Sequence, residues 1–363
     1  MRVSSLFSLL IGIAAFVSWT PVFAAEEVGN LYEAEVNVLA KGQKDRKEAF
    51  GLALLQVTIK VSGSRGAAAN PVIVEAMESP NRFVQQFRYD NAPTVAEGGE
   101  SPESPALILW VQFDAPAVDA LIREAGMPVW GRVRPSVLVL VAVESAGGRE
   151  LLSSDDVGGW AEFIRRAADG RAVPLVLPLM DLEDRARLRA SDVWAGFEDN
   201  VRGAAERYQS EGVLLGRIYE QLPNFWEARW RLLLEDGRHE WLDQGETLDV
   251  VLLAGVHESA DRLASRFGGF TGTTVASGVE LSVTGIRSLR DYARTLQYLG
   301  SLDEISRVDI TNVNAGSVSF RVDARGGRET VRQIIALGNT LENTLAEDGQ
   351  GGLNAGLSYR LLP

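Results

Sequence analysis

The spacing of apolar residues predicts a first group of helices and strands in the first third of the chain. Residues 31–38 alternate apolar and polar side chains, as a half-buried strand does. Residues 41–62 carry apolar side chains at helical spacing, and Gly63 suits the end of that helix. The expected elements are a strand over 31–38, a helix over 41–62, two short helices within 71–87, an exposed loop over 91–105, a strand over 107–113 and a helix over 115–125.

A second group follows, with longer apolar runs. Residues 136–143 are continuously apolar, which is typical of a strand covered on both faces. The order β-α-β-α-β-β-β-α indicates a mixed sheet flanked by helices. The expected elements are strands over 136–143, 173–179 and 212–219, helices over 160–168, 192–209 and 248–267, and a hairpin of 225–235 with 239–246 around Asp236 and Gly237.

A third group has the order β-α-β-β-α-β, which is the ferredoxin-like order. Its expected elements are strands over 279–283 and 356–361, helices over 288–299 and 330–341, and a hairpin of 306–312 with 317–322. The predicted fold class is therefore α+β, with three small α/β modules in series. The predicted domains cover 25–130, 131–268 and 278–363, with a Gly- and Thr-rich linker over 269–277.

The first 24 residues have the layout of a secretory signal peptide. Arg2 precedes an apolar run over 6–17, Pro21 breaks the run, and small residues flank a cut after Ala24. The run is about 12 residues long, whereas a membrane-spanning helix needs roughly 20. We therefore predict a periplasmic protein released from its leader. The alternative is an uncleaved leader that anchors the chain in the inner membrane.

The amino-acid composition further limits the possible binding partners and membrane anchors of the protein. The chain contains no Cys, which excludes disulfides, thiolate metal sites and the lipid anchor that bacterial lipoproteins carry on a cysteine. The formal net charge is −13, so the chain as a whole repels nucleic acid and anionic lipid. We expect no nucleic-acid partner, no lipid anchor, and membrane contact only if the leader is retained.

Motifs of known catalytic or metal chemistry are not found in the sequence. Both histidines lie in the pattern His-Glu-x-x-Asp, starting at His239 and His257, where zinc proteases have a second His. On the predicted strand the ends of the pattern lie about 13 Å apart. On the predicted helix, His257 and Asp261 can meet, as a surface pair or as part of a metal site. Serine-nucleophile elbows and phosphate-binding loops are also missing. We therefore assign no catalytic, cofactor-binding or metal-ligating residue and expect no cofactor.

Two features remain as candidates for contacts with a partner. Acidic residues cluster over 181–199. They either form a pair of catalytic carboxylates, as in glycosidases, or lie at the starts of helices. Trp226 and Trp230 face one side of a predicted strand, as a binding surface or as core against the helix over 248–267. The candidate interaction residues are Asp181, Glu183, Asp184, Asp192, Trp194, Trp226 and Trp230.

Several strings over residues 30–268 resemble a family of exported proteobacterial proteins catalogued only as a domain of unknown function. They are Leu31-Tyr32-Glu33-Ala34-Glu35-Val36, Val61-Ser62-Gly63-Ser64-Arg65, Asn70-Pro71, Pro128-Val129-Trp130-Gly131, Leu179-Met180-Asp181-Leu182-Glu183-Asp184 and Asp192-Val193-Trp194. The element order of the second group is similar to a periplasmic module at the amino end of the Tol translocation protein and in lipoprotein activators of penicillin-binding proteins. That resemblance implies binding of partners, not catalysis.

These observations predict a non-catalytic interaction or accessory protein of cell-envelope biogenesis with an envelope protein as its partner. Two alternatives stay open. One is an envelope hydrolase of unrecognised type that works through carboxylates, and the other is a periplasmic ligand carrier with a large apolar pocket.

Overall fold

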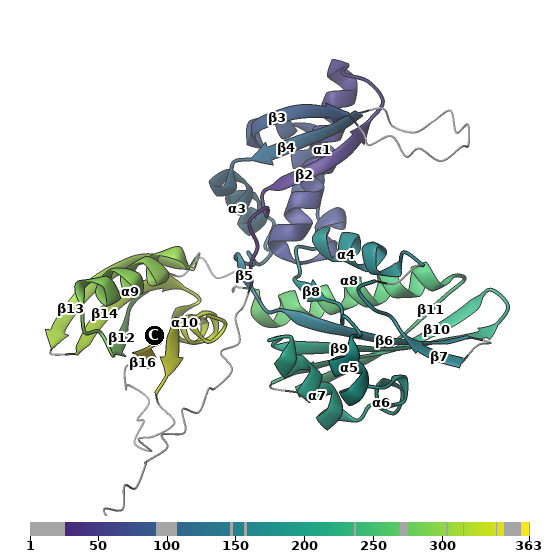
Figure 1. The fold of residues 1–363 in the computed structure, drawn as a ribbon. Coiled ribbons are helices and arrows are strands. Elements are labelled where there is room, and N and C mark those ends of the chain that lie inside the picture. The colour runs from purple at the N-terminus through teal and green to yellow at the C-terminus, as the bar shows by residue number, and fades with distance from the viewer. Residues whose placement is uncertain are drawn as a thin grey trace, which may run out of the picture.

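The computed structural model describes residues 26–91, 107–145, 148–155, 158–235, 237–268, 275–302, 304–314, 316–338, 340–344 and 357–362. The predicted signal peptide, nearly all of the predicted loop over 91–105, Asp236 and residues 269–274 of the predicted linker lie outside these ranges. Helices and sheets alternate in several modules, so the predicted α+β fold is confirmed (Figure 1). Within these ranges, no helix combines the length and apolarity that a membrane span requires.

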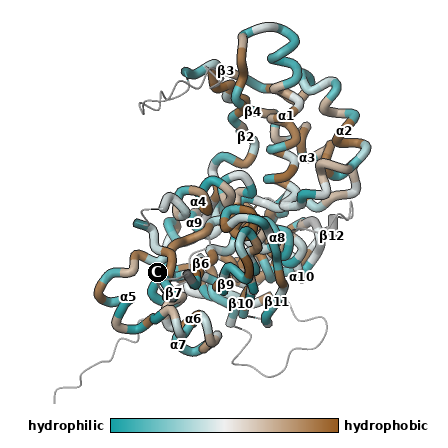
Figure 2. The backbone as a smooth tube through the Cα atoms, turned by 90° about the vertical axis from the view of Figure 1, so that its right-hand side faces the viewer, coloured by the Kyte–Doolittle hydropathy of each residue, from teal (hydrophilic) through white to brown (hydrophobic). Residues whose placement is uncertain are grey.

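The first module is a three-stranded antiparallel sheet of order β2-β4-β3 packed on helices. Its elements are β2 (Glu33–Val38), α1 (Gln43–Ser62), η1 (Arg65–Ala69), α2 (Pro71–Glu78), η2 (Pro80–Phe83), β3 (Val84–Asn91), β4 (Leu107–Phe113) and α3 (Ala115–Glu124). The apolar face predicted for α1 is buried, with Leu54, Val57 and Val61 fully covered. Figure 2 shows hydrophobic stretches, in brown, along β4, α1 and α3.

One prediction in this module is wrong. The second short helix was expected to run to residue 87, but a single 3-10 turn ends at Phe83 and residues 84–91 form β3. Pairing with β4 supplies the backbone hydrogen bonds of this segment, so tertiary pairing overrides its local preference.

The second module is a six-stranded mixed sheet of order β11-β10-β9-β6-β7, with β8 beside β6. Its elements are β6 (Val137–Ser145), β7 (Gly148–Leu151), α4 (Trp160–Asp169), β8 (Leu175–Val176), α5 (Leu182–Arg187), α6 (Ala190–Ala195), α7 (Glu198–Arg207), β9 (Gly212–Leu222), β10 (Phe225–Leu234), β11 (Gly237–Gly245) and α8 (Leu248–Phe267). Helices α4 and α8 pack on one face, and α6 and α7 on the other.

Three details differ from the expected second group. The strand predicted over 173–179 shrinks to β8, because Pro174 and Pro178 beside it have no N–H for the ladder. The helix predicted over 192–209 divides into α6 and α7 at Gly196, whose φ of 72° is left-handed. The short hairpin strand β7 was not predicted. The bounds of α8 agree with the prediction.

Trp230 fixes β10 against α8. Its side chain is 2% exposed and its ring fills the space above Gly216 of β9 and Gly255 of α8. A Cβ at Gly255 would lie 2.2 Å from the indole, and one at Gly216 would lie 2.5 Å from it. Trp241 of β11 stacks on Trp230 with ring centroids 6.4 Å apart. The two glycines therefore set how closely helix and sheet approach.

The third module is a five-stranded sheet of order β13-β14-β12-β16-β15. Its elements are β12 (Val275–Thr284), α9 (Leu289–Ser301), β13 (Ile305–Asn314), β14 (Ser317–Arg325), α10 (Gly327–Ala336), β15 (Leu341–Asn343) and β16 (Leu357–Leu361). The predicted β-α-β-β-α-β order is present with β15 added before the last strand, which runs parallel to β12. Residues 275–277, assigned to the linker from the sequence, belong to β12.

Two buried arginines join the first and second modules. Arg171, 2% exposed, donates to the Gly63 carbonyl at the end of α1 (2.7 Å) and to Asp261 of α8 (2.6 Å). Arg134 pairs with residue 26 through β5 (Val133–Arg134) and β1 (Glu26–Glu27), and its guanidinium donates to the carbonyls of Lys60 and Ala172, 2.8 Å from each. Each of the two arginines thus donates hydrogen bonds to acceptors in both modules.

Replacing Gly255 with Ala is expected to lower the free energy of unfolding by about 2 kcal/mol, because the new methyl group overlaps the Trp230 ring. The control is Gly203→Ala on α7, where a Cβ meets nothing within 4 Å and the helix should gain about 0.5–1 kcal/mol. Denaturant unfolding followed by tryptophan fluorescence measures both. Equal effects of the two substitutions would contradict this packing.

Candidate anion-binding site

One face of the second module's sheet is only half covered. Helices α6 and α7 pack on β6 and β9, through Val193, Val201 and their neighbours. Along β10 and β11 the same face stays accessible: the side chain of Arg229 is 55% exposed, and Leu242 is 49% exposed. The sheet therefore presents a strip about two strands wide, roughly 10 Å, beside α6.

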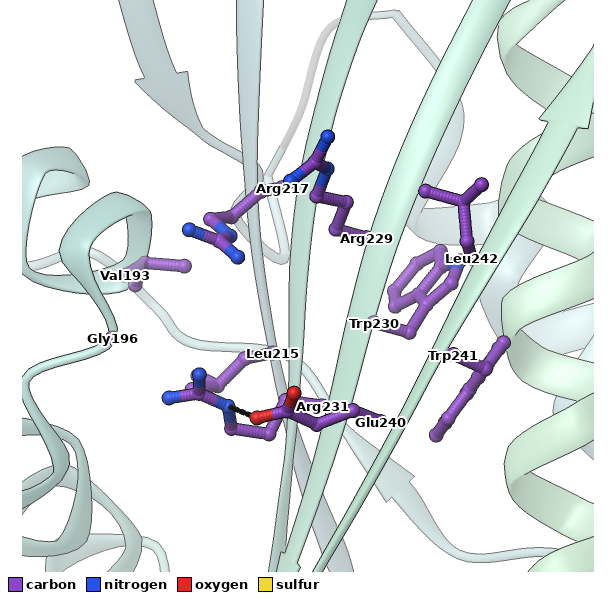
Figure 3. Close-up of a pocket in the computed structure, with 10 residues that line it drawn as sticks. All are labelled: Val193, Gly196, Leu215, Arg217, Arg229, Trp230, Arg231, Glu240, Trp241 and Leu242. Atoms are coloured by element: carbon purple, nitrogen blue, oxygen red, sulfur yellow. Dashed lines mark hydrogen bonds and ion pairs between the residues drawn. The ribbon is translucent and has the colours of Figure 1, made fainter.

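Three arginines point onto this strip. Because Trp230 faces α8, strand alternation directs its neighbours Arg229 and Arg231 to the opposite face. Arg217 of β9 is the cross-strand partner of Arg229. Figure 3 shows Arg217 and Arg231 extending toward α6, away from the two tryptophans.

The arginines line a hollow of about 310 Å³, which we call the arginine groove. Its lining residues are Val193, Gly196, Leu215, Arg217, Arg229, Trp230, Arg231, Glu240, Trp241 and Leu242.

The three arginines differ in their partners. Arg231 donates from Nε to Glu240 (2.7 Å), and Arg229 donates from Nε to the buried Glu227 (2.9 Å). Arg217 donates from Nη1 to the Trp194 carbonyl (2.9 Å). Among the described residues, no carboxylate lies within ion-pair distance of Arg217. Burial, followed by repulsion from Arg231 and Arg229, lowers the pKa of Arg217 below its usual range. Glu240, which pairs with Arg231, acts on Arg217 through its charge and partly offsets this lowering, but Arg217 has no ion-pair partner of its own among the described residues.

This arrangement is unfavourable for the protein alone. Like charges directly opposite on neighbouring strands destabilise a sheet, and Arg217 and Arg229 are such a pair. A bound anion relieves the repulsion, since guanidinium groups bind carboxylate or phosphate through charge-assisted and often bidentate hydrogen bonds. In a chain of net charge −13, the groove gathers three guanidinium groups, of which Arg229 and Arg231 are paired with Glu227 and Glu240 and Arg217 is not paired with a carboxylate among the described residues.

A second hollow of about 290 Å³ adjoins the groove and shares Arg217 and Arg229 with it. Its other lining residues are Trp194 of α6 and Tyr219 of β9, whose ring centroids lie 6.2 Å apart. Arg149 of β7 lies over the Trp194 ring, 4.0 Å from its centroid. We call this hollow the aromatic lobe.

The acidic candidates over 181–192 have structural partners. Asp181, at the start of α5, accepts hydrogen bonds from Arg207 of α7, the shorter one being 2.6 Å. This hydrogen bond lowers the pKa of Asp181 to about 2. Asp184 is buried between Arg207 and the Tyr208 hydroxyl. Glu183 pairs with Arg187 (3.2 Å), and Asp192 accepts from the Arg189 amide at the start of α6. Asp181 and Asp184 thus join α5 to α7, whereas Asp192 caps its own helix, α6.

The tryptophan candidates lie in two different environments. Trp230 is buried against α8, so the core alternative holds for it. Trp226 is half-buried and packs against the same core. Trp194 is half-buried and forms a wall of the aromatic lobe. For Trp226 and Trp230 the sequence left two alternatives, a binding surface or packing in the core. In the structure both pack against the core that includes the helix over 248–267.

The second His-Glu-x-x-Asp pattern lies at the junction of the first and second modules. Asp261 accepts from both Arg171 and Arg65, 2.6 Å from each. Burial and the nearby Arg171 lower the pKa of His257 to about 4. Across the described part of the chain, no three His, Asp or Glu side chains gather closely enough to hold a metal ion.

The sequence interpretation missed the arginines. The segment Arg229-Trp230-Arg231 carries a usable signal, because a buried Trp between two arginines on a strand directs both cations to the other face. Arg217 lies opposite Arg229 because of the register between β9 and β10. The pattern of apolar and polar residues in a single strand does not reveal that register.

Comparison with known proteins finds a family match for the first module. The family model described as "Domain of unknown function (DUF8605)" matches residues 25–131. The matched segment ends before the second module and so does not include the arginine groove. No curated protein and no solved structure matches the chain.

Replacing Arg217 with Gln is expected to leave the free energy of unfolding unchanged or to raise it by up to about 0.5 kcal/mol, because a partly desolvated like-charge contact disappears. The same exchange at Arg207 should destabilise the protein, because Asp184 then stays buried without its cation. Thermal unfolding at low and high salt compares the two. Any gain at Arg217 should shrink in high salt, and a clear loss at Arg217 would assign it a structural role instead.

Proposed function

We propose that this protein is a non-catalytic interaction protein of the periplasm that acts in cell-envelope biogenesis by holding an acidic segment of a partner protein in the arginine groove. The leader pattern over residues 1–24 supports export. The observation that carries the binding role is Arg217, a partly desolvated cation between two further arginines with no carboxylate of its own among the described residues.

The shape of the groove supports a protein segment as the occupant. It is an open hollow on a sheet face and not an enclosed cavity, so a chain can lie across it. Leu215, Leu242 and Val193 supply apolar surface among the cations. Helices normally cover both faces of such a sheet, and an acidic segment of a partner would complete the layer beside α6 and α7.

Engagement of the module's carboxylates supports binding over catalysis. Asp181 and Asp184 both bind Arg207, Glu240 binds Arg231, and Glu227 binds Arg229. The resemblance of this module to Tol-type periplasmic modules and to exported proteobacterial proteins points in the same direction and is part of the proposal. The groove's cations would raise the rate of encounter with an acidic partner and favour its orientation.

A photoreactive residue placed at position 242 tests this function directly. Leu242 lines the groove and is 49% exposed, whereas the control position Leu182 on α5 is 87% exposed and is not among the groove's lining residues. We expect illumination of cells that export the full chain to give a discrete protein adduct from position 242. Mass spectrometry should place the cross-link in an Asp- and Glu-rich segment of the partner.

The dependence of this adduct on the groove's arginines shows whether charge holds the partner there. The adduct from position 242 should disappear when Arg217→Gln and Arg229→Gln are introduced together, while an Arg187→Gln variant on α5 should keep it. An adduct that survives the loss of Arg217 and Arg229, or an equal yield from position 182, would overturn the proposal.

A further inference from the structure

We infer that the occupant of the arginine groove carries an aromatic ring next to its carboxylate, with the ring seated in the aromatic lobe. The inference rests on the proposed function and specifies its ligand. The two hollows have Arg217 and Arg229 in common. A carboxylate held by these arginines therefore lies beside the walls formed by Trp194 and Tyr219.

Contacts within the protein anchor the walls of the lobe. Trp194 has Arg149 stacked over its ring at 4.0 Å, and its backbone carbonyl accepts the hydrogen bond from Arg217. The Tyr219 hydroxyl donates to the buried Glu227, which also accepts from Arg229. The two rings contact each other, with centroids 6.2 Å apart and planes inclined by 56°, and together form one aromatic wall. Such prior anchoring lowers the entropy lost when a ring binds.

The volume and chemistry of the lobe select the ligand. About 290 Å³ accommodates one aromatic side chain, whose preferred contacts are the edges and faces of other rings and guanidinium planes. The polar groups that line the lobe are the guanidinium donors of Arg217 and Arg229 and the Tyr219 hydroxyl, already bonded to Glu227. Sugar hydroxyls also need acceptors, whereas carboxylates and peptide carbonyls need donors alone. These observations favour an acidic peptide over an acidic glycan.

Fluorescence anisotropy with four labelled probes of similar size tests the inference. The probes are a decapeptide with Asp residues flanking one Phe, the same peptide with Phe→Ala, the same peptide with every Asp→Asn, and an oligogalacturonate. We expect the Asp–Phe peptide to bind best and the Phe→Ala peptide to bind about 5- to 10-fold more weakly. The Asn peptide and the oligogalacturonate should show no saturable binding.

Variants of the full chain assign the effect to the lobe. Trp194→Leu keeps apolar packing but removes the ring, so the preference for Phe over Ala should vanish while acidic binding remains. Tyr219→Leu serves as the second variant if Trp194→Leu does not fold. The matched control is Phe197→Ala, since Phe197 follows α6, is 57% exposed and is not among the lobe's lining residues; it should keep the full preference.

The outcomes separate this inference from the proposed function. Equal binding of the Phe and Ala peptides to the unaltered chain overturns the aromatic lobe and leaves the acidic groove standing. Unchanged binding of every acidic probe by Arg217→Gln overturns both. Tighter binding of oligogalacturonate than of either acidic peptide replaces the peptide with a glycan and contradicts the inference.

Discussion

The contact of Trp230 with Gly216 and Gly255 determines which side chains the second module presents on the open face of its sheet. It seats β10 on α8 and leaves only one orientation for the rest of the strand. Because side chains alternate along a strand, burial of Trp230 obliges Arg229 and Arg231 to face away from α8. Register with β9 then places Arg217 opposite Arg229. A hydrophobic contact on one face of the sheet thus determines the electrostatics of the other, and a side chain larger than Gly at position 255 would disturb both.

Cations serve two different purposes in this protein. At the junction, Arg171 and Arg134 are almost wholly covered and each donates to several carbonyl or carboxylate partners, so they hold the first and second modules together. Arg207 plays a comparable part between α5 and α7. In the groove, Arg217 has one carbonyl partner and two like charges nearby. The contrast matters because burial alone does not separate the structural arginines from Arg217, for which we propose a ligand, whereas the number of acceptors bound to each does.

Helices with a clear apolar stripe could be predicted closely from the sequence, as α8 over 248–267 and the buried face of α1 show. The conversion of residues 84–91 to a strand depends on pairing with β4, which local spacing does not contain. The break at Gly196 follows from the left-handed backbone of that glycine. The same limit applies to the site. Trp194 was a candidate from its segment alone, and it lines the aromatic lobe, but the arginines around it converge only through the register of β9 with β10. The acidic residues stood out in composition, and they turned out to neutralise Arg207 or to begin helices.

The most direct test of the central role of Arg217 is an NMR titration of the full chain, labelled with ¹⁵N-arginine, with a hexaglutamate peptide. The Nε–Hε signal of Arg217 can be assigned by its loss in Arg217→Lys. Our account predicts a saturable shift of the Arg217 and Arg229 signals that weakens as salt is raised. A shift no larger than that of Arg187, an exposed arginine on α5 already paired with Glu183, would contradict it.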